Sequence, residues 1–137
     1  SDPSNMAAFS DLVLDELSYN APGALETVEG RLSVASGASE LASLYSLYGR
    51  ALAKSRKWGR AHTAFEKSID LDENNPHTLW HYANCVLIPT RKRARAKSMC
   101  ETALKLPSLR GNSRSISPSA RRLIRRLTDT IENLERT

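Results

Sequence analysis

The sequence predicts an all-α protein built from repeated pairs of antiparallel helices. Through most of its 137 residues, apolar side chains recur every three to four positions, which is the spacing of one helix face. No stretch alternates apolar and polar residues convincingly as a half-buried strand would. The strongest observation is that one pattern returns 35 positions later, where Tyr45 and Ala61 correspond to Trp80 and Ala96. A helix pair with this period indicates an α-α superhelix of about seven helices.

The N-terminal part is expected to form a helical hairpin that is not a copy of the repeat. Residues 1–5 precede the first methionine and are interpreted as a vector remnant, which leaves a single helical domain at 6–137. The hairpin covers 6–36, and its first helix over 6–19 ends at the Asn-Ala-Pro-Gly turn at 20–23. A shift of the period back into this hairpin finds none of the repeat's landmark residues.

The first repeat is assigned to residues 39–75. Ser39 is expected to cap its first helix, because a serine hydroxyl can accept a bond from a free backbone N–H. The second helix is expected from about residue 57 to 71. The small residues Gly49 and Ala61 stand where these two helices could approach closely.

The second repeat is assigned to residues 76–107. Pro76 suits the first position of a helix, where the missing N–H costs nothing. That helix is expected to end at Pro89, and the next one to begin near Arg91.

A polar loop at 108–117 leads to a capping helix at 118–136. Ser117 followed by Pro118 is a good helix start. Apolar residues line one face of the capping helix, and arginines flank them. A polar outer face is what the terminal helix of a repeat array requires.

The repeated segment, residues 41–107, resembles the tetratricopeptide repeat, whose pattern is W-x2-L-G-x2-Y followed by A-x3-F. The matching residues take the leading aromatic, glycine, alanine and phenylalanine positions: Tyr45 and Trp80, Gly49, Ala61 and Ala96, Phe65 and Cys100. Two residues depart from it, because Asn84 replaces a glycine and Arg56 occupies a turn position usually given to glycine. The resemblance implies a right-handed stack of hairpins whose concave groove binds peptides or partner proteins.

The same resemblance implies which side chains face the groove. They come from the first helix of each repeat: Ser43, Ser46, Arg50, Lys54, Thr78, His81 and Cys85. Family members that bind chaperone tails carry a two-carboxylate clamp of Lys, Asn and Arg. Here Ser46, Arg50 and Tyr82 stand at three of those positions instead, so binding of such a tail is not expected.

Two related families offer a different function. The second repeat also resembles the half-a-tetratricopeptide repeat of RNA-processing proteins through Trp80 and Tyr82. The 35-residue spacing is that of pentatricopeptide repeats, which read single-stranded RNA. Two such units would specify too few bases, so the pentatricopeptide interpretation is set aside.

Charge is distributed unevenly along the chain. The net charge is +5, and the positive excess lies after residue 90. The arginines of this basic surface are Arg91, Arg93, Arg95, Arg121, Arg122, Arg125 and Arg126. An acidic protein partner ranks first and nucleic acid second, because the last aromatic that could stack on a base is Tyr82. A membrane ranks third, because the basic helix has no Trp or Phe anchor.

Ser117 is also a candidate phosphorylation site. Arg114 lies three residues before it and Pro118 directly after it, and kinases recognise either feature. A phosphate at a helix N-terminus is electrostatically favourable. An exposed linker without modification is the alternative.

Neither a metal, a cofactor nor an enzymatic activity is predicted. His77, His81 and Cys85 share one helical face, but no fourth zinc ligand accompanies them. Phosphate loops, nucleophile elbows and HExxH helices are not found. The two cysteines, Cys85 and Cys100, fit free thiols in a reducing compartment, with a cytoplasmic location expected and the nucleus as the alternative.

The sequence therefore predicts a non-enzymatic adaptor that holds a partner's peptide or helix in a groove. Its basic C-terminal end would contact an acidic partner. The alternatives are an RNA-binding helical-repeat module and a structural module that assembles with copies of itself.

Overall fold

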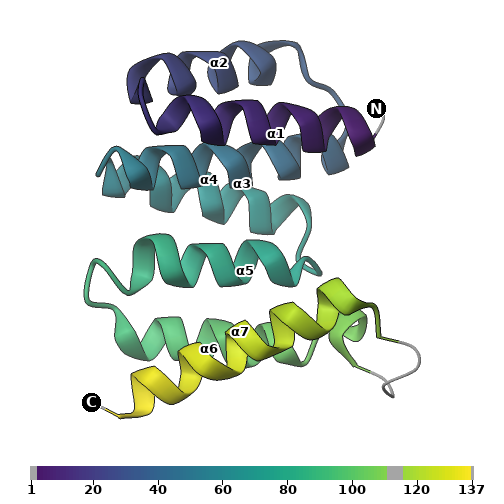
Figure 1. Ribbon diagram of the computed structural model, residues 1–137, viewed down its shortest axis with the longest axis vertical. Helices are drawn as coiled ribbons and strands as arrows, with labels where there is room; N and C mark the ends of the chain where they lie inside the picture. The colour runs from purple at the N-terminus through teal and green to yellow at the C-terminus, as the bar shows by residue number, and fades with distance from the viewer. Residues whose placement is uncertain (1–2, 111–115, 137) are drawn as a thin grey trace. The chain divides into compact units, whose positions relative to one another are not determined.

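A computed structural model describes residues 3–110 and 116–136, and the side chains from Asn5 onward within them. These residues form α-helices and no strand (Figure 1). The α-helices are α1 (Pro3–Leu17), α2 (Ala21–Val34), α3 (Ala38–Lys54), α4 (Trp58–Leu71), α5 (Pro76–Tyr82), α6 (Arg93–Leu104) and α7 (Pro118–Glu135). A π-helix, Ala83–Leu87, continues α5, and a short 3₁₀ turn, Pro107–Leu109, follows α6. The predicted all-α fold is confirmed.

The chain divides into two compact units, Ser1–Glu73 and Asn74–Thr137. The first unit contains α1 to α4, and the second contains α5 to α7. The boundary falls at the turn between the two predicted repeats. Each unit therefore holds the helices of one predicted repeat, together with α1 and α2 in the first unit and α7 in the second.

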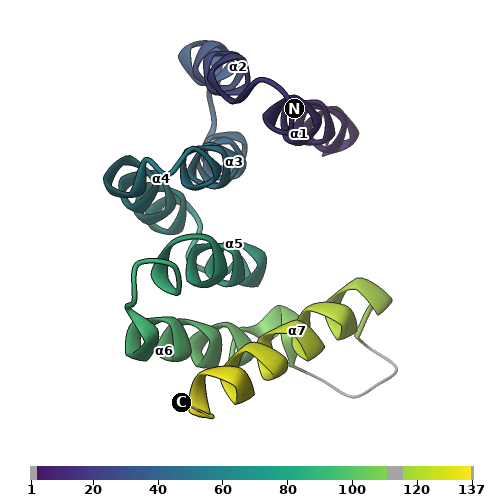
Figure 2. The same ribbon diagram turned by 60° about the vertical axis from the view of Figure 1, so that its left-hand side comes forward.

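In the first unit, α3 and α4 pack closely along their length (Figure 2). Phe65 is fully buried, and its ring lies against the backbone of Gly49. A Cβ atom on Gly49 would come within 2.7 Å of the ring, a distance that real Cβ contacts do not show. Ala61 is also fully buried. The expected close approach of two helices at these small residues is confirmed.

A buried hydrogen bond also joins α3 and α4, away from the contact of Gly49 with Phe65. The hydroxyl of Ser68 donates a hydrogen bond of 2.6 Å to the backbone carbonyl of Ala42. Both residues are buried, so this bond satisfies a hydroxyl that water does not reach. Gly49 and Ser68 thus fix how α4 lies on α3.

The N-terminal hairpin packs on α3 through its own apolar stripe, which includes Val13, Ala24 and Val28, all fully buried. Arg31 of α2 lies 4.9 Å above the ring of Phe9 and 3.6 Å from the carboxylate of Glu40. These contacts join α1, α2 and α3 without any repeat landmark.

Both repeats make the same turn, and it recurs after 35 residues. Arg56 and Arg91 adopt the left-handed conformation, with φ of 60° and 64°. The N–H of Lys57 bonds the carbonyl of Leu52 at 2.9 Å, and the corresponding bond from Lys92 to Leu87 is 2.8 Å. The turn, more than the side chains around it, is the feature that the two repeats share.

Helix ends differ from the expectations in three places. Ser39 does not cap α3, because the helix already begins at Ala38 and Gly37, with φ of 92°, is its N-cap. α6 begins at Arg93 and not near Arg91, since Arg91 occupies the left-handed position of the turn. α1 begins earlier than residue 6, at Pro3, where a proline suits the first position.

Other expected ends agree with the structure. Asn20 caps α2 by accepting a bond from the N–H of Gly23, and α5 begins at Pro76. The hydroxyl of Ser117 accepts a bond of 3.1 Å from the N–H of Ala120 and so caps α7. Of the predicted polar loop, residues 111–115 lie outside the described residues.

Replacement of Gly49 by alanine tests the close approach. The added methyl group would collide with Phe65, and we expect Gly49→Ala to lower the free energy of unfolding by about 1–3 kcal/mol. Gly30→Ala is the matched control: it lies within α2 with no atom near its Cβ, and it should stabilise by about 0.5–1 kcal/mol. Urea denaturation measures both, and equal effects would contradict the packing described.

Replacement of Arg91 by glycine tests the left-handed turn. Release of an arginine from this conformation gains about 1–2 kcal/mol, and the extra freedom of glycine in the unfolded chain removes about 0.4–1 kcal/mol of it. We expect Arg91→Gly to raise the free energy of unfolding slightly. Ser98→Gly, at an exposed right-handed position of α6, should lower it by about 0.5 kcal/mol. A destabilised Arg91→Gly protein would show that the arginine side chain stabilises the turn.

Candidate functional site

The predicted groove residues of the first unit share one face of α3. Ser43, Ser46 and Arg50 are half-buried, and Lys54 is exposed at the end of the helix. Successive residues of an α-helix are about 100° apart, so these four side chains fall within a sector of about 80°. This face is polar and carries two positive charges.

In the second unit the predicted groove residues are less accessible than expected. Thr78 is buried, with 3% of its surface exposed, and this corrects its assignment to an open groove. His81 and Cys85 are half-buried. Thr78 lies on the side of α5 that also carries the buried Leu79 and Tyr82, whereas the sequence pattern treated it as a polar surface position.

Cys85 belongs to a feature that the sequence did not reveal, the π-helix Ala83–Leu87. Here the N–H of Ile88 bonds the carbonyl of Ala83 five residues earlier, at 2.9 Å. The side-chain amide of Asn84 donates a bond of 2.9 Å to the carbonyl of Trp80. Asn84 stands where the first repeat has Gly49, and its side chain folds back onto its own helix. Such short π segments are frequent at functional sites.

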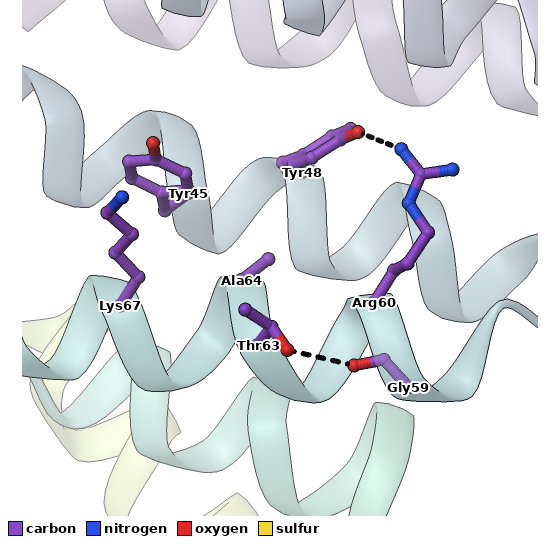
Figure 3. Close-up of a pocket in the computed structure, with 7 residues that line it drawn as sticks. All are labelled: Tyr45, Tyr48, Gly59, Arg60, Thr63, Ala64 and Lys67. Atoms are coloured by element: carbon purple, nitrogen blue, oxygen red, sulfur yellow. Dashed lines mark hydrogen bonds between the residues drawn. The ribbon is translucent and has the colours of Figure 1, made fainter.

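A pocket of about 320 Å³ opens between α3 and α4 (Figure 3). Its principal lining residues come from one face of each helix: Tyr45, Tyr48, Arg60, Thr63, Ala64 and Lys67. The hydroxyl of Thr63 donates to the carbonyl of Gly59 at 3.2 Å, which satisfies this hydroxyl within α4. Sequence reasoning treated the tyrosines as repeat landmarks and missed this pocket.

One end of the pocket is built by a polar triad of Glu29, Tyr48 and Arg60. The Tyr48 hydroxyl donates to the Glu29 carboxylate at 2.6 Å, and Nη2 of Arg60 donates to both of them. Burial and the bond to Glu29 raise the pKa of Tyr48 above its ordinary value of 10.0. Tyr48 therefore stays protonated as a donor at neutral pH.

The other end of the pocket is formed by Lys67 and Tyr45. The ammonium of Lys67 lies 5.0 Å from the centre of the Tyr45 ring, within the range of a cation–π contact. Arg60 lies 5.8 Å from the centre of the Tyr48 ring in the same manner. A signal for this pocket was present in the sequence: two cations seven residues apart on one helix, and two tyrosines three apart on its partner.

The predicted basic surface is exposed, and aromatic rings lie beneath part of it. Arg126 of α7 lies 5.3 Å from the ring centre of Trp80, and Arg95 of α6 lies 5.5 Å from that of Tyr82. The sequence has no aromatic residue after Tyr82. In the second unit, however, these two rings, both on α5, lie next to the arginines. Burial, together with the charge of Arg126, lowers the pKa of His77.

The remaining basic residues divide between two helices. Arg121, Arg122 and Arg125 are exposed on α7, as is Arg93 at the start of α6. Arg91 is exposed in the preceding turn. Lys97 of α6 pairs with Glu135 of α7 at 3.1 Å. α7 buries Leu123 and Leu127, and its arginines at 121, 122, 125 and 126 are exposed.

The two remaining candidates from the sequence are the zinc ligands and the phosphorylation site. In the described part of the chain, His77, His81 and Cys85 do not form a group that could hold a metal ion. Ser117 is exposed, and its hydroxyl is the N-cap of α7, while Arg114 of its kinase motif lies outside the described residues. No helix among the described residues has both the length and the hydropathy to span a membrane.

Comparison with known proteins shows the fold. No family model matches the sequence, and no curated protein matches it. A crystal structure of the Yersinia enterocolitica type III secretion translocator chaperone SycD, in an alternative dimer, is similar with a TM-score of 0.74 and 16% identity. That match covers 98% of this chain and 94% of the other.

A second SycD crystal structure, in complex with a peptide of the translocator YopD, is similar with a TM-score of 0.72 and 16% identity. It covers 98% of this chain and 95% of the other. The likeness spans nearly the whole chain and confirms an all-α fold of the tetratricopeptide-like class.

The two cysteines should differ sharply in reactivity. Burial, with a smaller contribution from Glu101, raises the pKa of Cys100 from its ordinary value of 9.0 to about 11, and the residue is fully buried. We expect only half-buried Cys85 to react with a thiol reagent at pH 8, and both to react in denaturant. Cys85→Ser should remove the fast phase. Rapid labelling that persists in Cys85→Ser would contradict the burial of Cys100.

The same shift has a consequence for stability. Between pH 9 and 11 the folded chain keeps the Cys100 proton that the unfolded chain loses, so the free energy of unfolding should fall as pH rises through this range. Cys100→Ala should lack this contribution when the two pH profiles are compared.

Proposed function

We propose that this chain is a non-enzymatic protein-binding module of the tetratricopeptide type, which holds a peptide or helix of a partner protein. The observation that carries the proposal is the likeness over 98% of the chain to SycD, a chaperone that has been crystallised with a peptide of a translocator. Helical-repeat folds generally present such surfaces. The matching repeat residues, from Tyr45 to Phe65, support membership of this class.

The polar face of α3 is the surface that we propose for the partner segment. It combines Ser43 and Ser46, which can exchange hydrogen bonds with a peptide backbone, with the charges of Arg50 and Lys54. Arginine pairs a carboxylate through two parallel bonds, so an acidic side chain or a chain terminus suits Arg50. In the second unit, His81 and Cys85 are the accessible members of the predicted set.

The basic surface of the second unit is proposed as a contact for an acidic protein. Arg121 and Arg125 lie about one turn apart on α7, Arg122 adjoins Arg121, and all three are exposed. Arginines in such a row also suit phosphates, so RNA binding is the second candidate function. The position of Trp80 beneath Arg126 adds an aromatic ring to this surface.

Affinity capture from a lysate, followed by mass spectrometry, tests the proposal. We expect Arg50→Glu with Lys54→Glu to remove a defined set of partners, because both charges on the α3 face are reversed. Glu66→Lys with Asp70→Lys, at exposed positions of α4, is the matched control and should keep them. If neither double variant changes the captured proteins, the α3 face is not the binding surface.

A parallel measurement separates the two candidates for the basic surface. Arg122→Glu with Arg125→Glu should release an acidic protein from the captured set. A salt-sensitive gel shift of an RNA oligomer that disappears in this variant would favour the RNA-binding alternative. Absence of a shift at low salt would remove it. Light scattering of the same preparations reports whether the partner is a second copy of the chain.

A further inference from the structure

The pocket between α3 and α4 is a surface separate from the one proposed above. At about 100° per residue, the mean direction of Tyr45 and Tyr48 on α3 lies about 170° from the middle of the sector that contains Ser46 and Arg50, although Tyr45 itself is only about 100° from Ser46. The two surfaces therefore lie on opposite sides of α3. The two sets share no residue, so each surface can be altered without substituting residues of the other.

The floor of the pocket is apolar. Ala64 is buried to 96%, since only 4% of it is exposed, and the hydroxyl of Thr63 is already bonded to its own helix. The rings of Tyr45 and Tyr48 form the opposite wall. Figure 3 shows Ala64 and Thr63 between the two cations, Lys67 and Arg60. This arrangement suits an aliphatic side chain in the centre and anionic groups at both ends.

The two cations have a defined spacing. Arg60 and Lys67 are seven residues apart on α4, which is two helical turns and about 10 Å of rise. An incoming helix that lies along α4 presents residues seven apart at the same spacing, with the residues three and four positions along between them. Carboxylates at the outer positions would meet Arg60 and Lys67, and aliphatic side chains at the inner positions would meet Ala64.

Both cations are held in place and keep bonding capacity. Arg60 uses Nη2 for its bonds to Tyr48 and Glu29. Among the described residues, no partner is found for its Nε and Nη1 groups, and each can still donate a single hydrogen bond to a carboxylate. Lys67 is held over Tyr45, and no carboxylate of the described residues pairs with it. Preorganised charges lose less entropy when they bind.

We propose that this pocket binds an acidic amphipathic helix of a partner protein, with two carboxylates seven positions apart and leucine-like side chains between them. The mode is a helix laid into a groove, with the apolar side chains as anchors and the rim charges fixing the register. The proposal is independent of the function assigned to the opposite face of α3.

Fluorescence anisotropy with a synthetic peptide tests it. The probe is a labelled helical peptide of about 18 residues, with glutamates seven positions apart and leucines three and four positions after the first glutamate. We expect saturable binding that weakens as salt rises, because the rim charges are exposed and screened. A peptide with both glutamates replaced by glutamine should bind at least about threefold more weakly.

Charge reversal locates the site. Lys67→Glu changes an exposed side chain whose cation–π partner is Tyr45, so the protein should fold, and affinity for the acidic peptide should drop by at least about threefold. Lys105→Glu makes the same charge change at an exposed position of the second unit, outside both proposed surfaces, and should leave the affinity unchanged. Circular dichroism of both variants confirms folding.

Three outcomes would overturn the proposal. Equal affinities of the glutamate and glutamine peptides would show that the charges of Arg60 and Lys67 do not contribute to binding of the peptide. Loss of binding in Lys54→Glu but not in Lys67→Glu would move the peptide to the α3 face and support the proposed function alone. Binding of a scrambled peptide of the same composition would show that only net charge is recognised.

Discussion

The contact of Phe65 with the backbone of Gly49 is the constraint on which the first unit depends. A ring can lie against a helix backbone only where a residue has no side chain, and Gly49 supplies that position in the centre of α3. The approach brings Ser68 within reach of the Ala42 carbonyl. It also sets the separation of the helix faces on either side, which decides how wide the pocket at Tyr45 and Tyr48 is. The same contact therefore determines both the packing of α3 on α4 and the width of the pocket.

The second repeat solves the same packing problem with different residues. Asn84 stands in place of the glycine, and buried Cys100 stands in place of the phenylalanine, so a larger residue on one helix accompanies a smaller one on the other. The side-chain amide of Asn84 donates a bond to the carbonyl of Trp80 within its own helix. The π-helix is found at this position, where a wider turn leaves backbone carbonyls in need of a partner. The recurring turn at Arg56 and Arg91 keeps the two helix pairs alike despite this exchange.

The fold could be predicted well because it follows from the spacing of the repeated residues and of the helix-start signals along the sequence. The period of 35, Pro76 at a helix start and Ser117 as a cap depend on local chemistry that can be recognised one segment at a time. The predicted start of α3 was wrong. Ser39 and Gly37 are both acceptable N-cap residues, and only the backbone conformation distinguishes them. The π-helix could not be predicted, because no residue type specifies it.

The candidate sites were harder to predict than the helices. Thr78 was assigned to the surface because threonine is polar, although its neighbours on the helix bury it. The pocket was missed because its residues come from two helices, and because the tyrosines had already been assigned a structural role. The aromatic rings beneath Arg95 and Arg126 were missed for a similar reason: the contact depends on the packing of α5 with α6 and α7 and not on nearness in the chain.

The triad of Glu29, Tyr48 and Arg60 has a consequence for communication within the first unit. Glu29 belongs to α2, so the cation at one end of the pocket is also a tether for the N-terminal hairpin. An anion that binds the remaining N–H groups of Arg60 brings a second negative charge close to Glu29. Occupation of the pocket and attachment of α2 are thus thermodynamically linked, and by reciprocity each changes the free energy of the other by the same amount.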